Sequence, residues 1–238
     1  MKKIISTMIC IILLSPFFVN SIQANDNMLD FIEENICTRE EMNELYKNFL
    51  ELGIDNNTAV KLVEKMNKGL MIDSLNPDLT DLAAVEVEEN FGLRIEKRTY
   101  PDGSVRKSVY PISNLPSTGI IPRSIYGGEY RSGSGWWTWY GRIVHEQSGV
   151  ITAMYKIDCS GGANESSAII RAYDEKIITT YFKPTELDLS VKRRNVSGST
   201  PAWAQFKFRL TREGISDGKY CVNAYMDNSR YWSEYKAL

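Results

Sequence analysis

Apolar and polar side chains alternate along most of the second half of the chain, a pattern that predicts β-strands with one buried face. In the stretch 150–158, for example, Ile151, Ala153 and Tyr155 fall on one face. Further segments of this kind predict strands over 136–146, 150–158, 167–173, 176–182, 187–193, 202–210, 219–226 and 230–235. Short strands separated by turn residues at this spacing predict an antiparallel β-sandwich domain over 126–238.

Residues 25–90 have the helical period instead and predict a helical segment. Thr38 and Glu41 form a capping box, in which the hydroxyl accepts one free amide and the carboxylate accepts another. The apolar face of the helix that follows consists of Met42, Leu45, Tyr46, Phe49 and Leu50. We expect Asn56 or Asn57 to cap a second helix. The fold class is therefore α+β, with an N-terminal helical hairpin followed by the β-sandwich; the hairpin is marginal for independent stability and is expected to pack on another surface.

Between these two parts, residues 91–125 predict a β-hairpin and a linker. The segments LRIEKRTY and VRKSVY flank the turn sequence PDGS. Pro101 presets the backbone angle for a turn, Asp102 can bond the backbone ahead of it, and Gly103 accepts a positive φ. The residues after 111 are rich in Pro, Ser and Gly, which is typical of a linker.

The first 24 residues have the layout of a secretory signal peptide. Two lysines precede an apolar run from Ile4 to Val19, and a short polar patch ends at Ala24. The run of about 16 residues is shorter than the length of about 20 that crosses a bilayer, which favours cleavage over an uncleaved anchor. We expect cleavage between Ala24 and Asn25, with a site elsewhere between Ser21 and Ala24 as the alternative. The mature protein is then expected to be secreted, without a transmembrane segment.

Three cysteines remain after signal removal: Cys37, Cys159 and Cys221. Export permits a disulfide, and three cysteines allow one bridge. Cys159 ends one predicted strand and Cys221 lies in another, so this pair is the disulfide candidate. The alternative is that all three thiols stay reduced.

Acidic and basic residues are divided unevenly along the mature chain. Residues 25–100 contain 17 Asp and Glu against 8 Lys and Arg, a net charge of −9, and residues 101–238 contain 13 against 18, a net charge of +5. The acidic part could dock on the basic part, or the basic part could meet an anionic polymer of the cell envelope. A third interpretation is two solvated surfaces without a partner.

The segment GSGWWTWYG, residues 133–141, places four aromatic rings in one predicted strand. Alternation puts Trp136 and Tyr140 on one face and Trp137 and Trp139 on the other. Because a sandwich strand buries only one face, one pair is expected to face outward. That pair could pack under the helices, stack on sugar or lipid headgroups, or hold a protein partner. We name Trp137 and Trp139 as surface-binding candidates.

Lys192, Arg193 and Arg194 form a compact basic patch and complete the surface-binding candidates. Affinity for phosphate polymers grows with the number of charges engaged, so three or four give weak, salt-sensitive attachment. An exported protein is expected to meet an anionic cell-envelope polymer or a glycan rather than nucleic acid. The alternative is a basic turn that balances the acidic helices.

The residues offer little support for catalysis. His145 is the only histidine, no Gly-x-Ser-x-Gly segment occurs, and a zinc site needs three or four ligands. We therefore predict no catalytic, metal-binding or cofactor-binding residue and no cofactor. Glycosidases need only two carboxylates, but no spacing selects a pair among the candidates in the β-region. These candidates are Glu129, Glu146, Asp158, Asp174, Glu175, Glu186 and Asp188.

Several of these segments together resemble a group of uncharacterised small secreted proteins of Gram-positive bacteria. The resemblance rests on FLELGIDNNTAVKLVEKMNKGLMIDSLNP, on the YPDGS hairpin, and on SGVITAMYKIDC, SGSTPAWAQFKF and CVNAYMDNSRYW. It covers most of the mature chain. It implies export and an architecture of helices followed by a β-domain, and it implies no activity.

The sequence therefore favours a secreted, non-enzymatic protein that binds at the cell envelope or outside the cell. One alternative is a secreted toxin or bacteriocin-like effector, in which the acidic helical segment masks the basic β-domain. Another is a carboxylate-based glycan hydrolase.

Overall fold

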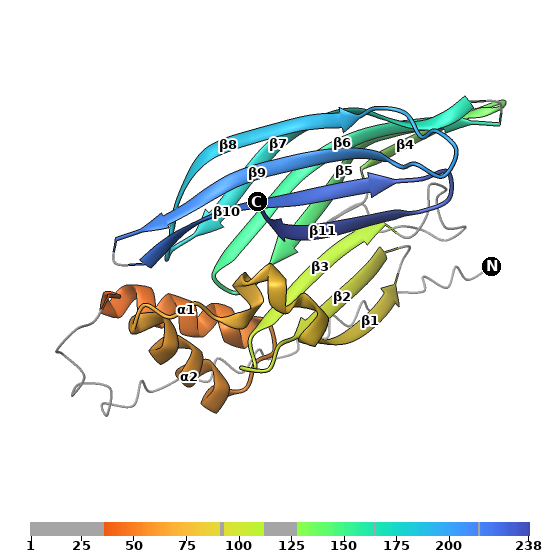
Figure 1. The fold of residues 1–238 in the computed structure, drawn as a ribbon. Helices are drawn as coiled ribbons and strands as arrows, with labels where there is room; N and C mark the ends of the chain where they lie inside the picture. The colour runs from red at the N-terminus through yellow and green to blue at the C-terminus, as the bar shows by residue number, and fades with distance from the viewer. Residues whose placement is uncertain (1–35, 91–92, 112–127, 164, 214) are drawn as a thin grey trace, which may run out of the picture. The chain divides into compact units, whose positions relative to one another are not determined.

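The computed structural model of the protein describes residues 36–90, 93–111, 128–163, 165–213 and 215–238. All of these belong to one compact unit. The predicted signal peptide and its cleavage site at Ala24 and Asn25 lie outside the described residues. Within them the chain is mostly antiparallel β-structure in two sheets, with a few helices, as expected for the α+β class (Figure 1). No helix in this part is long and apolar enough to span a membrane.

The larger sheet, called the large sheet below, has seven strands in the order β1-β2-β3-β5-β6-β7, with β4 paired to β5. Its strands are β1 (Ala84–Asn90), β2 (Leu93–Thr99), β3 (Val105–Pro111), β4 (Glu129–Gly133), β5 (Trp136–Gln147), β6 (Ile151–Gly162) and β7 (Glu165–Thr179). The predicted hairpin is confirmed as β2 and β3, which pair antiparallel. In its turn Gly103 has a φ of +82°, and Asp102 accepts a hydrogen bond of 2.9 Å from the Ser104 amide.

The small sheet contains four strands in the order β11-β10-β9-β8. These are β8 (Lys183–Arg193), β9 (Ala202–Arg212), β10 (Ile215–Met226) and β11 (Tyr231–Ala237). All of their pairings are antiparallel.

One predicted strand boundary is wrong. The segments 167–173 and 176–182 are predicted from the sequence as two separate strands. Instead β7 runs through them as far as Thr179. Its register against β6 shifts at this point, and Asp174 takes a φ of +56°. The extra residue is accommodated as a bulge, so the polar pair of Asp174 and Glu175 interrupts the ladder without ending the strand.

The two sheets share one apolar core. Tyr155 of β6 is buried and packs edge-on against Phe206 of β9, with 6.1 Å between ring centroids. Its hydroxyl lies 3.4 Å from the carbonyl oxygens of both Ala204 and Val222, on β9 and β10, which share its single proton. A side chain of the large sheet thus reaches the backbone of the small sheet, an arrangement consistent with a sandwich.

Both helices begin at a side-chain cap. Helix α1 (Arg39–Glu51) starts with the predicted capping box of Thr38 and Glu41, and this prediction is confirmed. Helix α2 (Asn56–Asn67) is capped by Asp55, whose carboxylate accepts the Thr58 amide at 3.1 Å. The expected cap at Asn56 or Asn57 is wrong by one or two residues. Asp55 directly precedes them, has the extended backbone of an N-cap residue, and already supplies the side-chain acceptor. Two 3₁₀ turns follow, η2 (Asp73–Leu75) and η3 (Pro77–Leu82).

The helices contact the hairpin turns at one end of the sheets (Figure 1). Tyr181, in the turn between β7 and β8, donates a hydrogen bond of 2.7 Å to the Met66 carbonyl of α2. Arg212, at the end of β9, donates to both carboxylate oxygens of Glu41 at 3.0 and 2.9 Å. A Cβ added to Gly149, in the turn between β5 and β6, would lie only 2.7 Å from Phe49 of α1. The helices therefore close this end of the core.

The end of the predicted helical segment is a strand. Residues 84–90 form β1, which pairs with β2 over its whole length. Valine and glutamate alternate here, and this period of two suits a strand better than a helix. The free amide and carbonyl groups along one edge of β2 provide the hydrogen-bond partners of β1. A search for helical periodicity in the sequence does not take such a neighbouring strand into account.

We expect Arg212→Ala to lower the free energy of unfolding by about 2–3 kcal/mol, because it removes a largely buried guanidinium and leaves its acceptors without a donor. Besides Glu41, these acceptors are the carbonyls of Ile36 and Tyr181. Urea unfolding of the mature protein measures the change.

The control is Arg209→Ala on the same strand, which removes an ion pair to Glu186 at 2.8 Å that lies near solvent. This variant is expected to change stability little, because exposed ion pairs contribute little. Equal losses in the two variants would contradict the anchoring role of Arg212.

Candidate binding surface

Aromatic and basic side chains gather on the outer face of the small sheet, the face directed away from the large sheet. In β9, Phe206 and Phe208 are buried in the shared core. Strand alternation then directs Trp203, Gln205 and Lys207 to the opposite face. Figure 1 views this face, and no helix or strand of the described part lies in front of it. It is therefore a surface that the rest of the described chain leaves open.

Three rings form a continuous stack across this face, called the aromatic row below. Tyr225 lies between Trp203 and Trp232, with centroid distances of 5.8 and 5.3 Å and interplanar angles of 20° and 11°. The guanidinium of Arg230 lies 5.0 Å from the Trp232 ring centroid. Because neighbouring rings face one another across the strands, their edges rather than their faces point to solvent. The row is thus a firm ridge and not a flat platform for a sugar ring.

Two amide side chains support the aromatic row from the next position along the strands. Gln205 donates a hydrogen bond of 3.0 Å to Asn223, which in turn donates one of 3.2 Å to the Tyr225 hydroxyl. Gln205 and Asn223 are both buried although they face outward. This chain of bonds fixes the orientation of the Tyr225 hydroxyl on the surface.

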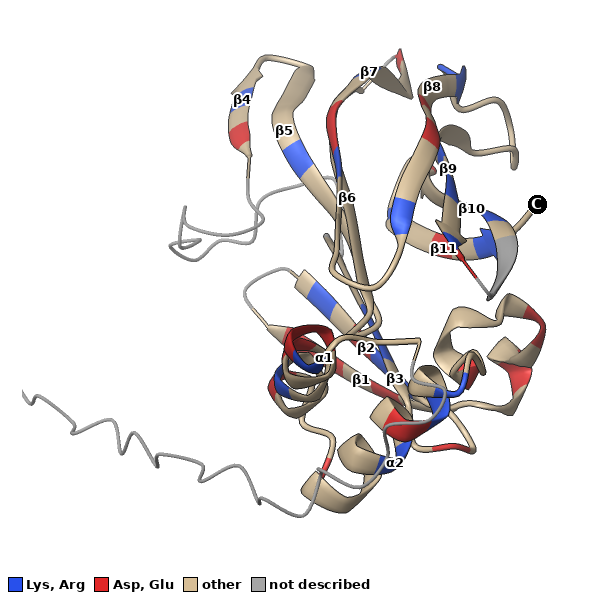
Figure 2. Ribbon diagram, turned by 90° about the vertical axis from the view of Figure 1, so that its left-hand side faces the viewer, with Lys and Arg blue, Asp and Glu red and all other residues tan. Residues whose placement is uncertain are grey.

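The predicted basic patch lies beside the aromatic row. Arg193 is the register partner of Trp203, and Lys192, Arg193 and Arg194 are exposed. Lys192 lies 3.9 Å from Asp188, at the limit of an ion pair. In Figure 2, segments of β9 and β10 are coloured blue, which marks the Lys and Arg residues of these strands. The structure thus brings the basic patch next to tryptophans, but these are Trp203 and Trp232 rather than the predicted pair.

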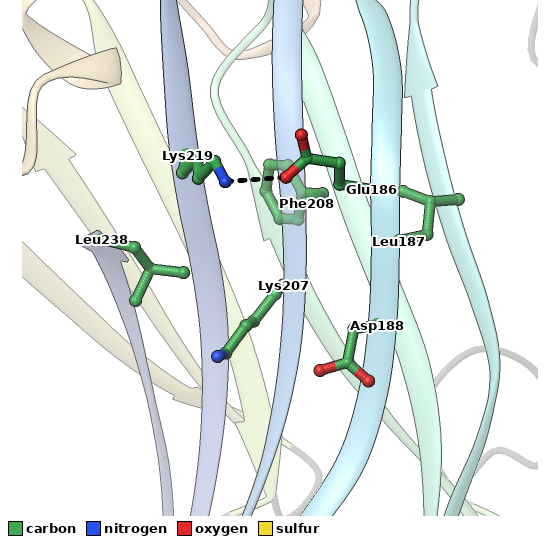
Figure 3. Close-up of a pocket in the computed structure, with 7 residues that line it drawn as sticks. All are labelled: Glu186, Leu187, Asp188, Lys207, Phe208, Lys219 and Leu238. Atoms are coloured by element: carbon green, nitrogen blue, oxygen red, sulfur yellow. Dashed lines mark ion pairs between the residues drawn. The ribbon is translucent and has the colours of Figure 1, made fainter.

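A groove of about 550 Å³ lies further along the same face (Figure 3). Glu186 and Lys219 line it and form an ion pair of 2.8 Å. Asp188 and Lys207 also line it. Lys207 forms no ion pair with any described residue, so its ammonium group is available to an anion.

The predicted surface pair in β5 is wrong in its orientation. Trp139 is only 3% exposed and lies between the Tyr130 ring, at 4.8 Å, and the Arg142 guanidinium, at 4.0 Å. Trp137 is partly buried and packs on the core. The outward pair is Trp136 and Tyr140, which are 49% and 36% exposed. Strand alternation assigned the four rings to the correct two faces of β5. Which of these faces is turned to the core depends on where the small sheet lies.

The glycines of this segment are explained by the tryptophans. A Cβ on Gly161 would lie 2.5 Å from the Trp137 ring, and one on Gly133 would lie 2.4 Å from the Trp136 indole nitrogen. Each ring therefore lies flat on the backbone of a neighbouring strand, where only glycine leaves room. Trp136 and Trp137 thus cover the glycine backbone at this end of the sheet, on opposite faces.

The predicted disulfide between Cys159 and Cys221 is wrong, because all three described cysteines are free and buried. Cys159 points into the core, where its sulfur accepts a hydrogen bond of 3.1 Å from the Tyr231 hydroxyl. Cys221 alternates with Tyr220 and Val222, which face the core, so its side chain points outward. Cys159 faces the core from the large sheet, whereas Cys221 faces away from the core on the small sheet, so the backbone of the small sheet lies between the two thiols. Burial raises the pKa of Cys159 to about 11 and also raises that of Cys221.

The two buried carboxylates among the candidates have structural roles. Glu146 accepts hydrogen bonds of 2.6 Å from Ser108 on β3 and from Ser233 on β11, and so joins the two sheets at one edge. Burial raises its pKa above the usual range. Asp158 accepts the Gly141 amide at 2.7 Å and Arg171 at 2.5 Å, which holds the β5 bulge at Gly141. The other candidates, Glu129, Asp174, Glu175, Glu186 and Asp188, are exposed.

The described residues contain no group of three His, Cys, Asp or Glu side chains that could hold a metal ion. His145 is 8% exposed, and burial lowers its pKa. No family model, no curated protein and no solved structure matches the chain.

Sequence reasoning missed the aromatic row, although the signal was present. In the segment AWAQFKF of β9, alanines and phenylalanines alternate with Trp203, Gln205 and Lys207. Alternation alone therefore indicates an outward tryptophan. It does not indicate that Tyr225 and Trp232 lie beside it, because strand register is set over long sequence separations.

We expect all three cysteines of the mature protein to react with iodoacetamide in denaturant without a reductant, since none is bridged. Mass spectrometry counts the alkylated residues. Omitting the denaturant is the control, and there the buried, protonated thiols are expected to react slowly. A peptide that links Cys159 to Cys221 would contradict the assignment.

We expect Glu146→Gln to raise the melting temperature more at pH 7.5 than at pH 4.5. The folded-state pKa of Glu146 is raised, so its contribution to stability is present at low pH and is lost as the pH rises through that pKa. Glutamine has no such loss, and it retains an oxygen that accepts a serine hydroxyl. All other titrating groups are common to both proteins. A difference that is constant or shrinks as the pH rises would contradict the raised pKa.

Proposed function

We propose that the protein acts outside the cell as a non-enzymatic binding protein, and that the outer face of the small sheet attaches to an anionic polymer of the cell envelope. The observation that carries the proposal is the position of Lys192, Arg193 and Arg194 beside the aromatic row, on a face that no described element covers. The signal-peptide pattern, and the resemblance to secreted proteins of Gram-positive bacteria, support export.

Cations on this face outnumber anions. The basic residues are Lys192, Arg193, Lys207, Arg209, Lys219 and Lys236, and the acidic residues are Glu186, Asp188 and Glu234. The acidic residues are occupied by ion pairs to Lys192, Arg209, Lys219 and Lys236. Arg193 and Lys207 on this face have no ion pair within the described residues, and neither has Arg194, the residue that directly follows β8. These three groups supply the attraction for a polymer that carries repeated negative charges.

The aromatic row suits a polymer in which charged groups alternate with hydroxyl-bearing units. Its rings are held in place by stacking, and the Tyr225 hydroxyl is oriented by Asn223. A ligand that binds such a rigid ridge orders few protein side chains, so little conformational entropy is lost. A phosphate-bearing polymer of sugar or polyol units offers both the anions and the hydroxyl groups that this surface can meet.

The described contacts between the helices and the β-domain leave the aromatic row uncovered, which argues against the masking alternative. The helices reach the β-domain at Arg212 and at the hairpin turns. Trp203 and Arg212 stand at opposite ends of β9, so the helices meet a different part of the sheet from the aromatic row.

Binding is tested with the mature protein and purified Gram-positive cell walls, either intact or stripped of their phosphate polymers by acid. We expect retention on intact walls at low salt, release as the salt concentration rises, and little retention on stripped walls. Arg193→Ala/Arg194→Ala is expected to weaken binding about tenfold or more, at roughly 1 kcal/mol for each cation near an anionic surface.

The matched control is Lys61→Ala/Lys68→Ala, which removes the same charge from exposed positions in and just after α2. It is expected to bind as the unchanged protein does. Failure to bind intact walls at low salt would refute the proposal. Equal weakening by the two variants would show that net charge, and not this face, governs attachment.

A further inference from the structure

Strand β1 forms an open edge of the large sheet. It is the last strand in the sheet order and pairs only with β2, without a register shift (Figure 1). All seven of its residues are exposed. Its outer edge therefore carries amide and carbonyl groups that form no ladder with any described strand. A regular, straight edge of this kind is a template on which a further strand can add.

The two faces of β1 differ in chemistry. Val85 and Val87 are 51% and 44% exposed and share one face with Glu89, whose carboxylate is paired with Arg94 of β2 at 2.9 Å. Glu86 and Glu88 share the other face, and neither forms an ion pair with a described residue. An added strand could cover the exposed side chains of Val85 and Val87.

A second copy of the chain fits this edge poorly. Antiparallel pairing of two β1 strands centred on Val87 would place Glu86 of one copy opposite Glu88 of the other. Like charges directly opposite each other in a sheet are destabilising. The edge is therefore better suited to a positively charged strand than to β1 of a second copy.

We propose that β1 binds an extended peptide segment in which basic and apolar side chains alternate, by adding it as a further antiparallel strand of the large sheet. Main-chain hydrogen bonds to the open edge provide the attachment. The apolar side chains of the peptide cover Val85 and Val87, and its lysines or arginines face Glu86 and Glu88. This site is separate from the outer face of the small sheet, and neither proposal depends on the other.

The test uses fluorescence anisotropy with a labelled, end-capped peptide of alternating lysine and valine, added to the mature protein. We expect saturable binding, loss of binding when alternate peptide amides are N-methylated, and loss when the lysines are replaced by glutamate. Glu86→Lys/Glu88→Lys is expected to weaken binding of the lysine peptide about three- to tenfold and to strengthen binding of the glutamate peptide. Both positions are exposed, so the fold is expected to tolerate the change.

Glu40→Lys/Glu44→Lys is the matched control, with the same charge change at exposed positions of α1. It is expected to bind the lysine peptide as the unchanged protein does. Absence of binding would overturn the proposal. Equal binding of the N-methylated peptide would also overturn it, because attraction by charge alone would then explain the result.

Amide hydrogen exchange provides an independent measurement. In the free protein we expect fast exchange at those β1 amides that point away from β2, and protection of the same amides when the lysine peptide is bound. Uniform protection of β1 in the free protein would show that the edge is already occupied, by a second copy or otherwise, and would overturn the proposal.

Discussion

Every other residue of the central strands is required for one shared core, and this constraint decides what the remaining residues can do. Tyr155 shows the constraint at its tightest. Its ring packs against Phe206, and its hydroxyl meets the backbone of both middle strands of the small sheet. Once this inner layer is in place, the side chains between its members must point outward. The aromatic row and the outward thiol of Cys221 follow from core packing.

A core made of two layers is open at its edges and ends, and polar contacts close these openings. Glu146 links Ser108 and Ser233 where β3 of the large sheet meets β11 of the small sheet. Arg212 ties α1 to the end of β9. Both contacts place an ionisable group where solvent is largely excluded, so each depends on its hydrogen-bond partners being complete. The helical segment, marginal for independent stability, is thereby part of the same compact unit.

Local patterns predicted the elements of this fold well where the pattern and the structural cause lie close together in the sequence. The capping box at Thr38 and the PDGS turn are such cases, because a few neighbouring atoms determine them. The direction of the tryptophan pairs could not be predicted in the same way. Trp137 and Trp139 face inward only because the small sheet, whose first strand begins at Lys183, covers that side. The cysteine pairing failed for the same reason, since it depends on which face each strand turns to the core.

The opposite charges of the two halves of the chain do not neutralise each other in the folded protein. Within the described part, two residue pairs form ion pairs between residues up to 100 and those after it. Glu41 pairs with Arg212, and Lys65 pairs with Asp102. Only the first of these joins an acidic residue of the acidic part to a basic residue of the basic part. Glu86 and Glu88 of β1, which form no ion pair with a described residue, and the basic side chains beside Trp203 instead remain at separate surfaces. Internal docking therefore does not account for the asymmetry. An uncompensated surplus of one sign at an open edge, and of the other sign on an open face, is what two different partners of opposite charge would require.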